Sequence, residues 1–231
     1  MAKGLLLDIG GVVLQNGAYL VNRLAQREPR LGPYVARVSG GTGVAGPGDE
    51  LWQQMLRHEV TERAFWAQRA HELGAELGLS WDTRAMITAL YEMPRQDWLV
   101  QPAVDLMRDT KAAGLPLGAL TNDLEDFHGR DWVSRQDWLA LFDVVVDASL
   151  TGVMKPAPEA FAAGADALGL APQEIVYLDD MPWNVAGGLR AGLQAIEVRY
   201  ADPGEALAEA RRRLGLPAVP SGRTALPPSP A

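Results

Sequence analysis

The sequence of 231 residues contains no cysteine, which excludes disulfide bonds and thiolate metal sites and suits a reducing cytoplasm. It has no apolar run near the roughly 18 residues that a membrane-spanning helix needs. Unlike a signal peptide, the first apolar residues run straight into the charged Asp8. Lysine is scarce, and the net charge is −8. This charge argues against nucleic-acid binding, which normally needs a basic face. We therefore expect a cytoplasmic protein without nucleic-acid or membrane partners.

The apolar runs that are present predict buried parallel strands. They lie at about residues 4–8, 115–120, 143–147, 174–178 and 195–199. Helical patterns separate the later runs, and each pattern is bracketed by a proline and a glycine: Pro102 and Gly114, Pro158 and Gly169, and Pro182 and Gly192. Alternating strands and helices imply right-handed crossovers, so the sequence predicts an α/β fold around a parallel sheet.

Residues 15–98 interrupt this alternation with helical periodicity and no convincing strand. Asp49, Thr61 and Ser80 can each cap a helix at its N-terminus. The segment 39–48 holds five glycines and a proline and predicts a loop. This part of the chain is therefore expected to be an all-helical insert.

Four polar fragments end the apolar runs or lie in loops between them. They are Asp8 with Gly10 and Gly11, the pair Thr121-Asn122, Lys155 beside Pro156, and the pair Asp179-Asp180. Each fragment alone also fits an ordinary strand-end turn or a solvated lysine. The glycines, however, let backbone N–H groups approach an anion closely. Two adjacent carboxylates repel each other unless a cation or hydrogen bonds compensate, and hard oxygen ligands suit Mg²⁺.

In this order, the four fragments resemble the motifs of the haloacid dehalogenase superfamily over roughly residues 4–200, as does the stretch 180–192. The resemblance implies a Rossmann-like hydrolase core, an inserted helical cap and hinges where the two join. We assign residues 1–14 and 99–215 to the core and 15–98 to the cap, with hinges near 14–18 and 94–101. The proline-rich segment 216–231 is expected to be a disordered tail.

The resemblance also implies a function: a Mg²⁺-dependent phosphatase, monomeric or homodimeric, acting on a small phosphorylated metabolite, with sugar phosphates favoured. Asp8 would attack phosphorus to form an aspartyl-phosphate, assisted by Thr121 and Lys155. The implied substrate-binding residues are Gly10, Gly11, Thr121, Asn122 and Lys155. The implied metal site comprises Asp8, Asp180 and the Gly10 carbonyl, with Asp179 and Asn184 acting through water or by orienting Lys155.

One position departs from the family pattern, because most of its phosphatases have a second Asp where this chain has Gly10. That Asp protonates the leaving oxygen and later activates water, which is worth ~10²–10⁴-fold in rate. The alternatives are a phosphatase that favours good leaving groups, a phosphatase with its acid elsewhere, a weakly active or non-catalytic binding module, and a 2-haloacid dehalogenase. Candidate replacement acids are Asp123, Asp126, His58, Glu59 and His71.

Two further classes do not fit. A phosphonate-cleaving cap needs a lysine between Lys3 and Lys111, and the sequence has none there. A phosphoacceptor receiver domain would place its acidic pair near the first strand rather than after the fourth run. Chain order therefore favours the hydrolase.

Substrate specificity would come from the insert. Aromatic residues at helical spacing are more often core than ligand contacts, which applies to Trp52, Trp66, Trp81 and Trp98. The insert also contains three arginines, which we expect to lie on a solvated helix face: Arg57, Arg63 and Arg69. The alternative is that they pair with an anionic group of the substrate. Residues 15–17, which enter the insert directly from the first motif, are better placed to contact substrate.

Overall fold

The computed structural model describes residues 2–199 and 203–218, which divide into two compact units. The sheet unit comprises the described residues up to Gln15 and from Leu99 onward, and the helical unit comprises Asn16–Trp98. The predicted tail falls outside the described residues from position 219 onward.

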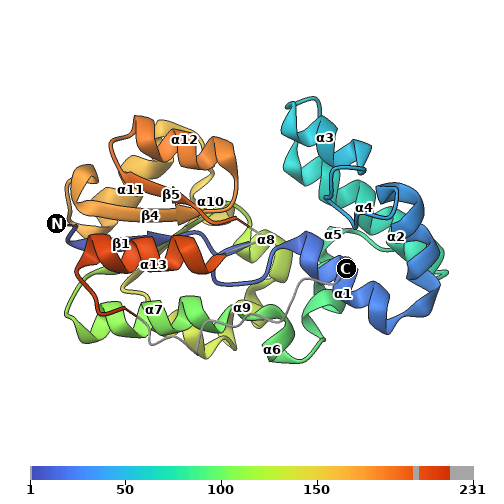
Figure 1. Cartoon of the computed structure of the whole chain (residues 1–231), viewed down its shortest axis with the longest axis horizontal. Helices are drawn as coiled ribbons and strands as arrows, with labels where there is room; N and C mark the ends of the chain where they lie inside the picture. Colours follow the sequence, from blue (N-terminus) through green and yellow to red (C-terminus); the bar gives the residue numbers. More distant parts are fainter. Residues whose placement is uncertain (1, 200–202, 219–231) are drawn as a thin grey trace. The chain divides into compact units, whose positions relative to one another are not determined.

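The sheet unit is built on five parallel strands in the order β3-β2-β1-β4-β5 (Figure 1). Their bounds are β1 (Gly4–Leu7), β2 (Leu117–Thr121), β3 (Val144–Asp147), β4 (Ile175–Asp179) and β5 (Gln194–Glu197). Each predicted strand overlaps an observed one, and the predicted α/β fold with a parallel, Rossmann-like sheet and an all-helical insert is confirmed.

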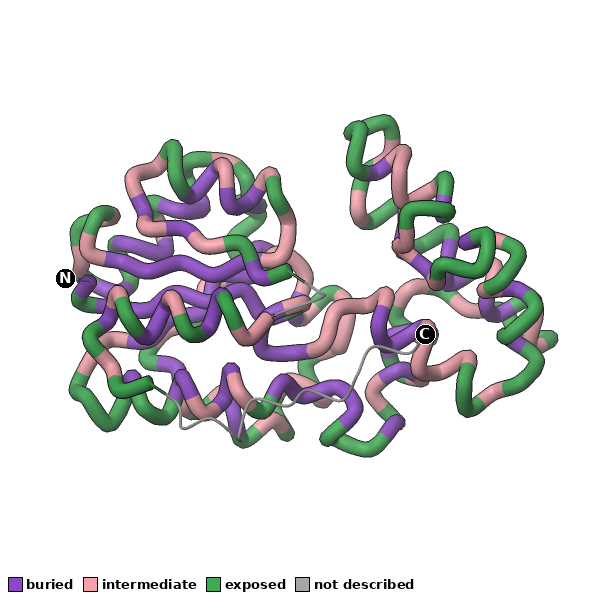
Figure 2. Tube along the Cα trace, in the orientation of Figure 1, coloured by how far each residue is buried: buried purple, intermediate pink, exposed green. Residues whose placement is uncertain are grey.

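Helices cover both faces of this sheet. One face packs against α11 (Pro158–Leu168) and α12 (Pro182–Arg190), and the other against α7 (Gln101–Ala112) and α13 (Pro203–Leu214) (Figure 1). The central strands β1, β2 and β4 are consequently buried along their whole length (Figure 2), which is why they are nearly continuous apolar runs. Shorter elements complete the unit: α8 (Leu124–His128), α9 (Arg130–Ser134), η2 (Asp137–Leu141), α10 (Ala148–Thr151) and η3 (Pro172–Glu174).

The helical unit contains α1 (Gly17–Arg27), η1 (Pro29–Leu31), α2 (Gly32–Ser39), α3 (Glu50–Leu56), α4 (Glu62–Glu76), α5 (Thr83–Tyr91) and α6 (Arg95–Trp98). Asp49 and Thr61 cap α3 and α4, as predicted. The prediction for Ser80 is wrong, because Asp82 caps α5 and accepts a hydrogen bond from the Ala85 N–H at 2.8 Å. A carboxylate two residues further on is an equally good cap.

A buried ion pair lies at the centre of the helical unit. The Arg69 guanidinium binds the carboxylates of Asp49 and Glu72, and the exposed fractions of Arg69 and Asp49 are only 3% and 0%. Asp49 also accepts a hydrogen bond from the Ala45 N–H at 3.0 Å, which fixes the glycine-rich loop. The prediction that Arg69 lies on a solvated face is therefore wrong, since α4 turns this side chain inward against α3.

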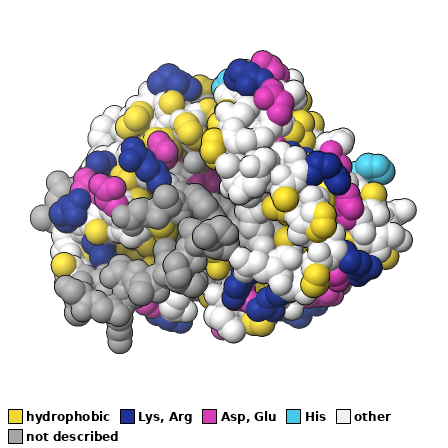
Figure 3. Space-filling model, turned by 45° about the vertical axis from the view of Figure 1, so that its right-hand side comes forward, with side chains coloured by type: hydrophobic (Ala, Val, Ile, Leu, Met, Phe, Trp, Pro, Cys, Tyr) yellow, Lys and Arg dark blue, Asp and Glu magenta, His cyan; other side chains and the backbone are white. Residues whose placement is uncertain are grey.

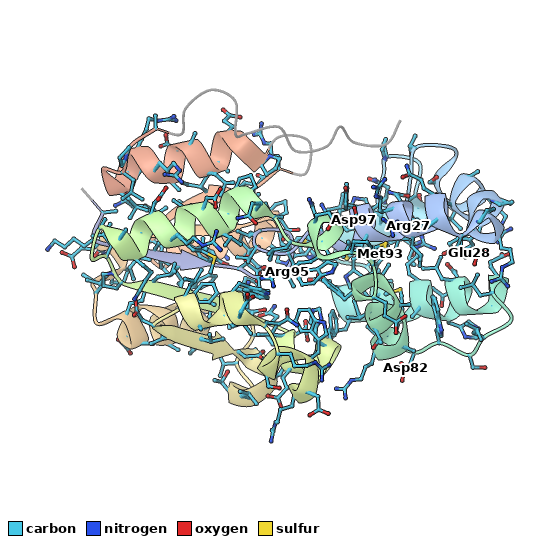
Figure 4. All side chains as sticks on the ribbon, turned by 90° about the horizontal axis from the view of Figure 1, so that it is seen from below. Arg27, Glu28, Asp82, Met93, Arg95 and Asp97 are labelled. Carbon is cyan, nitrogen blue, oxygen red and sulfur yellow. The ribbon has the colours of Figure 1, made fainter. Side chains whose placement is uncertain are left out.

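A second ion pair joins the first and last helices of the same unit. Asp97 is buried in α6 and binds Arg23 and Arg27 of α1; Figure 4 shows Arg27 and Asp97 side by side. The Trp98 indole N–H donates to the Met93 carbonyl at 3.0 Å. The ion pairs of Asp97 thus tie the N-terminal and C-terminal ends of the insert together.

On the face shown in Figure 3, Lys and Arg side chains lie interspersed with Asp and Glu side chains. Among the described residues, every helix is too short or too polar to cross a bilayer.

Candidate active site

The predicted site residues of the sheet unit meet at the carboxyl edge of its three central strands. Leu7 of β1 is in register with both Ala119 of β2 and Leu178 of β4, so the residues that follow them lie side by side. The Asp8 N–H donates to the Leu178 carbonyl at 2.9 Å, which continues the β1–β4 pairing up to the nucleophile candidate. Asp8, Thr121 and Asp179 are all buried there.

Lys155 connects two of these carboxylates. Its Nζ lies 3.0 Å from Asp8 Oδ1 and 2.7 Å from Asp179 Oδ2. Asn122 holds the backbone of Lys155: its Oδ1 accepts from the Lys155 N–H at 2.8 Å, and its Nδ2 donates to the Lys155 carbonyl at 3.1 Å. The Asn122 side chain therefore positions the lysine, so any contact it makes with substrate would come from its backbone.

Asp179 is surrounded by donors from the protein. Besides Lys155, it accepts hydrogen bonds from the Tyr177 hydroxyl, the Met181 N–H at 2.8 Å and Asn184 Nδ2 at 3.1 Å. A carboxylate engaged in this way is suited to orienting Lys155 rather than to binding a metal directly. Sequence reasoning missed Tyr177, although its position two residues before Asp179 places both side chains on the same face of β4.

With every group ionised, the site would carry more negative than positive charge, and the pKa values respond to this. Burial, as the largest cause, raises the pKa of Asp8 to about 8; Asp179 raises it further, and Lys155 opposes the shift. Burial disfavours the charged form of Lys155, but the attraction of Asp179 and Asp8 outweighs it and raises the pKa of the lysine. A single ammonium group thus faces two buried carboxylates, with Asp180 close by.

A divalent cation fits this arrangement. Asp8, Asp179 and Asp180 each offer an oxygen within 4.8 Å of the others. Gly11 has a φ of +72°, and a Cβ atom there would lie 2.0 Å from Asp180 Oδ2, so a side chain at this position would strain the backbone and displace the Asp180 carboxylate. Asn184 Oδ1 is buried with no hydrogen-bond partner among the described residues. Hard oxygen donors, excess negative charge and a buried acceptor without a partner suit hydrated Mg²⁺.

Gly10 differs from its neighbour in being exposed with open space around it. Among the described residues, no atom beyond Gly10 and its two chain neighbours lies within 4 Å of the position that its Cβ would occupy, and its φ lies outside the left-handed region. A side chain could therefore stand here, two residues after Asp8, without strain. Of the predicted replacement acids, Asp123 and Asp126 lie at the start of α8 in the sheet unit, whereas His58, Glu59 and His71 belong to the helical unit.

Asp147 is a further residue that sequence reasoning missed. It ends β3 in register with Thr121, and its carboxylate accepts hydrogen bonds from the N–H groups of Glu125 and Ser149, each at 2.9 Å. It thus caps the helix that directly follows Thr121-Asn122. An acidic residue at the end of the third apolar run was the available signal.

A model of haloacid dehalogenase-like hydrolases matches residues 2–192, which is most of the chain. The chain belongs to the haloacid dehalogenase-like hydrolase family. The resemblance that the sequence motifs indicated is thereby confirmed at the level of the family.

The chain is similar to proteins whose names denote different activities. The chain is 29% identical over 147 residues to validoxylamine A 7'-phosphate phosphatase of Streptomyces hygroscopicus subsp. limoneus, covering 64% of this chain and 65% of that one. It is 25% identical over 219 residues to acyl-CoA dehydrogenase family member 10 of Mus musculus, covering 93% of this chain but 19% of that one. The chain therefore spans less than two thirds of the length of either relative. Among solved structures, a dehalogenase with an intermediate complex has a TM-score of 0.60 at 17% identity, covering 92% of this chain and 97% of that one. This last likeness concerns the fold alone.

Proposed function

We propose that this haloacid dehalogenase-like hydrolase is a Mg²⁺-dependent phosphatase that acts on a small phosphorylated metabolite. The observation that carries the proposal is the contact of the Lys155 ammonium with Asp8 and Asp179, beside Asp180. A nucleophilic carboxylate, a fixed cation and a hard-oxygen metal site are the three requirements of phosphoryl transfer to an aspartate.

In the proposed reaction, an Asp8 oxygen attacks phosphorus and the bond from phosphorus to the leaving oxygen breaks. Water then attacks phosphorus and releases phosphate and the free carboxylate. Lys155 compensates the charge on Asp8 and on the transferring group, and the Thr121 hydroxyl and the backbone after it bind phosphate oxygens. Asp8, Asp180 and the Gly10 carbonyl would hold Mg²⁺, which when bound neutralises phosphate charge.

The alternative of a 2-haloacid dehalogenase is less well supported. Asp8 could displace halide from carbon without a metal, and the fold is shared with a dehalogenase. That chemistry, however, gives no reason to cluster Asp180 beside two further carboxylates with only one lysine to balance them. The similarity to validoxylamine A 7'-phosphate phosphatase also favours phosphoryl chemistry, and the substrate in that name suggests sugar-like phosphates as the first compounds to test.

Several assignments belong to the same proposal. We infer that residues 15–98 act as the cap that selects the substrate, and that residues 1–14 and 99–215 form the catalytic core. We also predict that the protein is cytoplasmic and that it is a monomer or a homodimer.

The deciding experiment is hydrolysis of p-nitrophenyl phosphate by the full chain with Mg²⁺ and with a chelator. We expect metal-dependent release of phosphate that Asp8→Asn abolishes. Asp166→Asn, the same change at an exposed position of α11, is the matched control and should retain full activity. Turnover that persists in folded Asp8→Asn would refute the assigned nucleophile. No turnover of aryl or sugar phosphates by the folded wild-type chain would favour the binding module, and release of halide from a 2-haloacid would favour the dehalogenase.

A further inference from the structure

We propose that Tyr177 is a positioning residue of the active site, whose buried hydroxyl fixes Asp179 and thereby holds the Lys155 ammonium against Asp8. This inference rests on the proposed phosphatase function, in which the ammonium assists the nucleophile. The hydroxyl of Tyr177 acts through the carboxylate of Asp179, to which it donates a hydrogen bond.

The hydroxyl of Tyr177 lies in a place where packing alone gives no reason for it. Tyr177 is fully buried in β4 and belongs to the core cluster that contains Leu6, Leu120 and Phe161. A buried hydroxyl costs free energy unless it is hydrogen-bonded. Phenylalanine has the same ring without this cost, so the reason for tyrosine here is the bond to Asp179.

The ring of Tyr177 is held from two sides. A Cβ atom at Gly188 of α12 would lie 2.8 Å from Cδ1 of the ring, so a side chain there would displace the ring. Glycine inside a helix lowers the stability of that helix, which indicates that close approach of the ring is needed at this position. Phe161 meets the ring edge to face, with 5.6 Å between the two centroids. These contacts keep the hydroxyl at the carboxylate of Asp179.

The hydroxyl and the Lys155 ammonium share one oxygen of Asp179. Tyr177 donates to Oδ2, and Lys155 Nζ lies 2.7 Å from the same atom and 3.0 Å from Asp8 Oδ1. Because the hydroxyl offsets part of the negative charge of Oδ2, it weakens the attraction of Asp179 for the ammonium. Without the hydroxyl, we expect Lys155 to move toward Asp179 and away from Asp8.

The first test is hydrolysis of p-nitrophenyl phosphate by Tyr177→Phe, which removes the hydroxyl and keeps the ring. We expect kcat to fall about tenfold with little change in KM, because the lost hydrogen bond supports the reacting groups rather than the binding of substrate. The matched control is Tyr34→Phe. Tyr34 is also buried, and its hydroxyl donates to Glu72 Oε2 at 2.6 Å in the helical unit. This control should keep the full kcat.

A second readout observes Lys155 directly and does not depend on turnover. The chain has only three lysines, so ¹⁵N in their side chains gives at most three ammonium signals in NMR. The side chains of Lys3 and Lys111 are 65% and 38% exposed, and exchange with water broadens their signals at neutral pH. The Lys155 side chain is 1% exposed and should give an observable signal. We expect this signal to shift or broaden in Tyr177→Phe and to stay unchanged in Tyr34→Phe.

A loss of kcat together with a changed Lys155 signal in Tyr177→Phe, both absent from Tyr34→Phe, supports the inference. An unchanged kcat or an unchanged signal in folded Tyr177→Phe overturns it, while turnover by the wild-type chain leaves the phosphatase function standing. No turnover by the wild-type chain refutes the phosphatase proposal itself, and the signal then decides whether Tyr177 holds Lys155. If Tyr177→Phe does not fold, Gly188→Ala, which keeps the hydroxyl but displaces the ring, should cause the same two changes.

Discussion

Burial of Asp8 makes the stability of the metal-free protein depend on pH in a defined direction. The pKa of this carboxyl is raised from 3.8 to about 8, chiefly by burial, so the folded state keeps a proton that the unfolded chain releases. The resulting stabilisation is fully present below pH 4 and is lost as the pH rises toward 8. We therefore expect the metal-free protein to become less stable on the alkaline side of neutrality.

A second group limits the pH range in which this effect can be observed. Burial lowers the pKa of His128 to about 3, so its neutral folded form contributes stability that is present above pH 6.5 and lost as the pH falls. The two effects oppose each other below pH 6.5, and only that of Asp8 remains above it. Between pH 6.5 and 8, a proton that only the folded state holds changes the free energy of unfolding by about 2 kcal/mol.

The assay is thermal and chemical denaturation of the full chain in a chelator at pH 6.5 and pH 8. A loss of about 2 kcal/mol corresponds to a fall in Tm of about 4–8 °C for a chain of this size. Asp8→Asn should abolish most of the difference, and Mg²⁺ should reduce it by stabilising the ionised carboxylate. An equal pH dependence in wild type and Asp8→Asn would refute the reasoning, since the titrating group would then be another one.

Three further predictions concern the metal site, the core of the helical unit and the reaction steps. Gly11→Ala places a methyl group 2.0 Å from an Asp180 carboxylate oxygen and should weaken Mg²⁺ activation at least tenfold in an activity titration. Gly10→Ala adds the same methyl group in open space and should leave Mg²⁺ activation unchanged. Equal effects of the two changes would contradict the geometry. Arg69→Met leaves the Asp49 carboxylate buried without its ion pair. The change should lower the free energy of unfolding by about 3–5 kcal/mol in denaturant titrations, and a loss below about 1 kcal/mol would show that the pair is dispensable. Without a base at Gly10, water attack on the phosphorylated Asp8 should be slow. Rapid mixing with p-nitrophenyl phosphate should therefore release a burst of one nitrophenolate per chain before the steady state. Release that is linear from the start would contradict this.

Local pattern alone determined the family and the elements of the sheet. The apolar runs predicted the five strands because a parallel sheet covered on both faces needs continuous apolar sequence. The order of Asp8, Thr121, Lys155 and Asp179 indicated the family, since strand-end positions in such a fold meet at one edge. Capping by Asp49 and Thr61 was equally local, because a cap depends on the next three residues.

Only the tertiary structure decided which side chains are buried and which donors they meet. Arg69 and Arg57 look alike in sequence, yet one is buried against Asp49 and the other is exposed. Lys155 reaches Asp179 from a position 24 residues away, and the cap that Asp147 provides for α8 also comes from another element, so no local window contains these contacts. The contrast between Gly10 and Gly11 is of the same kind. Both are glycines after the first strand, but the Asp180 carboxylate, which directly follows β4, crowds Gly11 and leaves Gly10 open. Contact across the edge of the sheet depends on tertiary packing, which the spacing of residues in the sequence does not reveal.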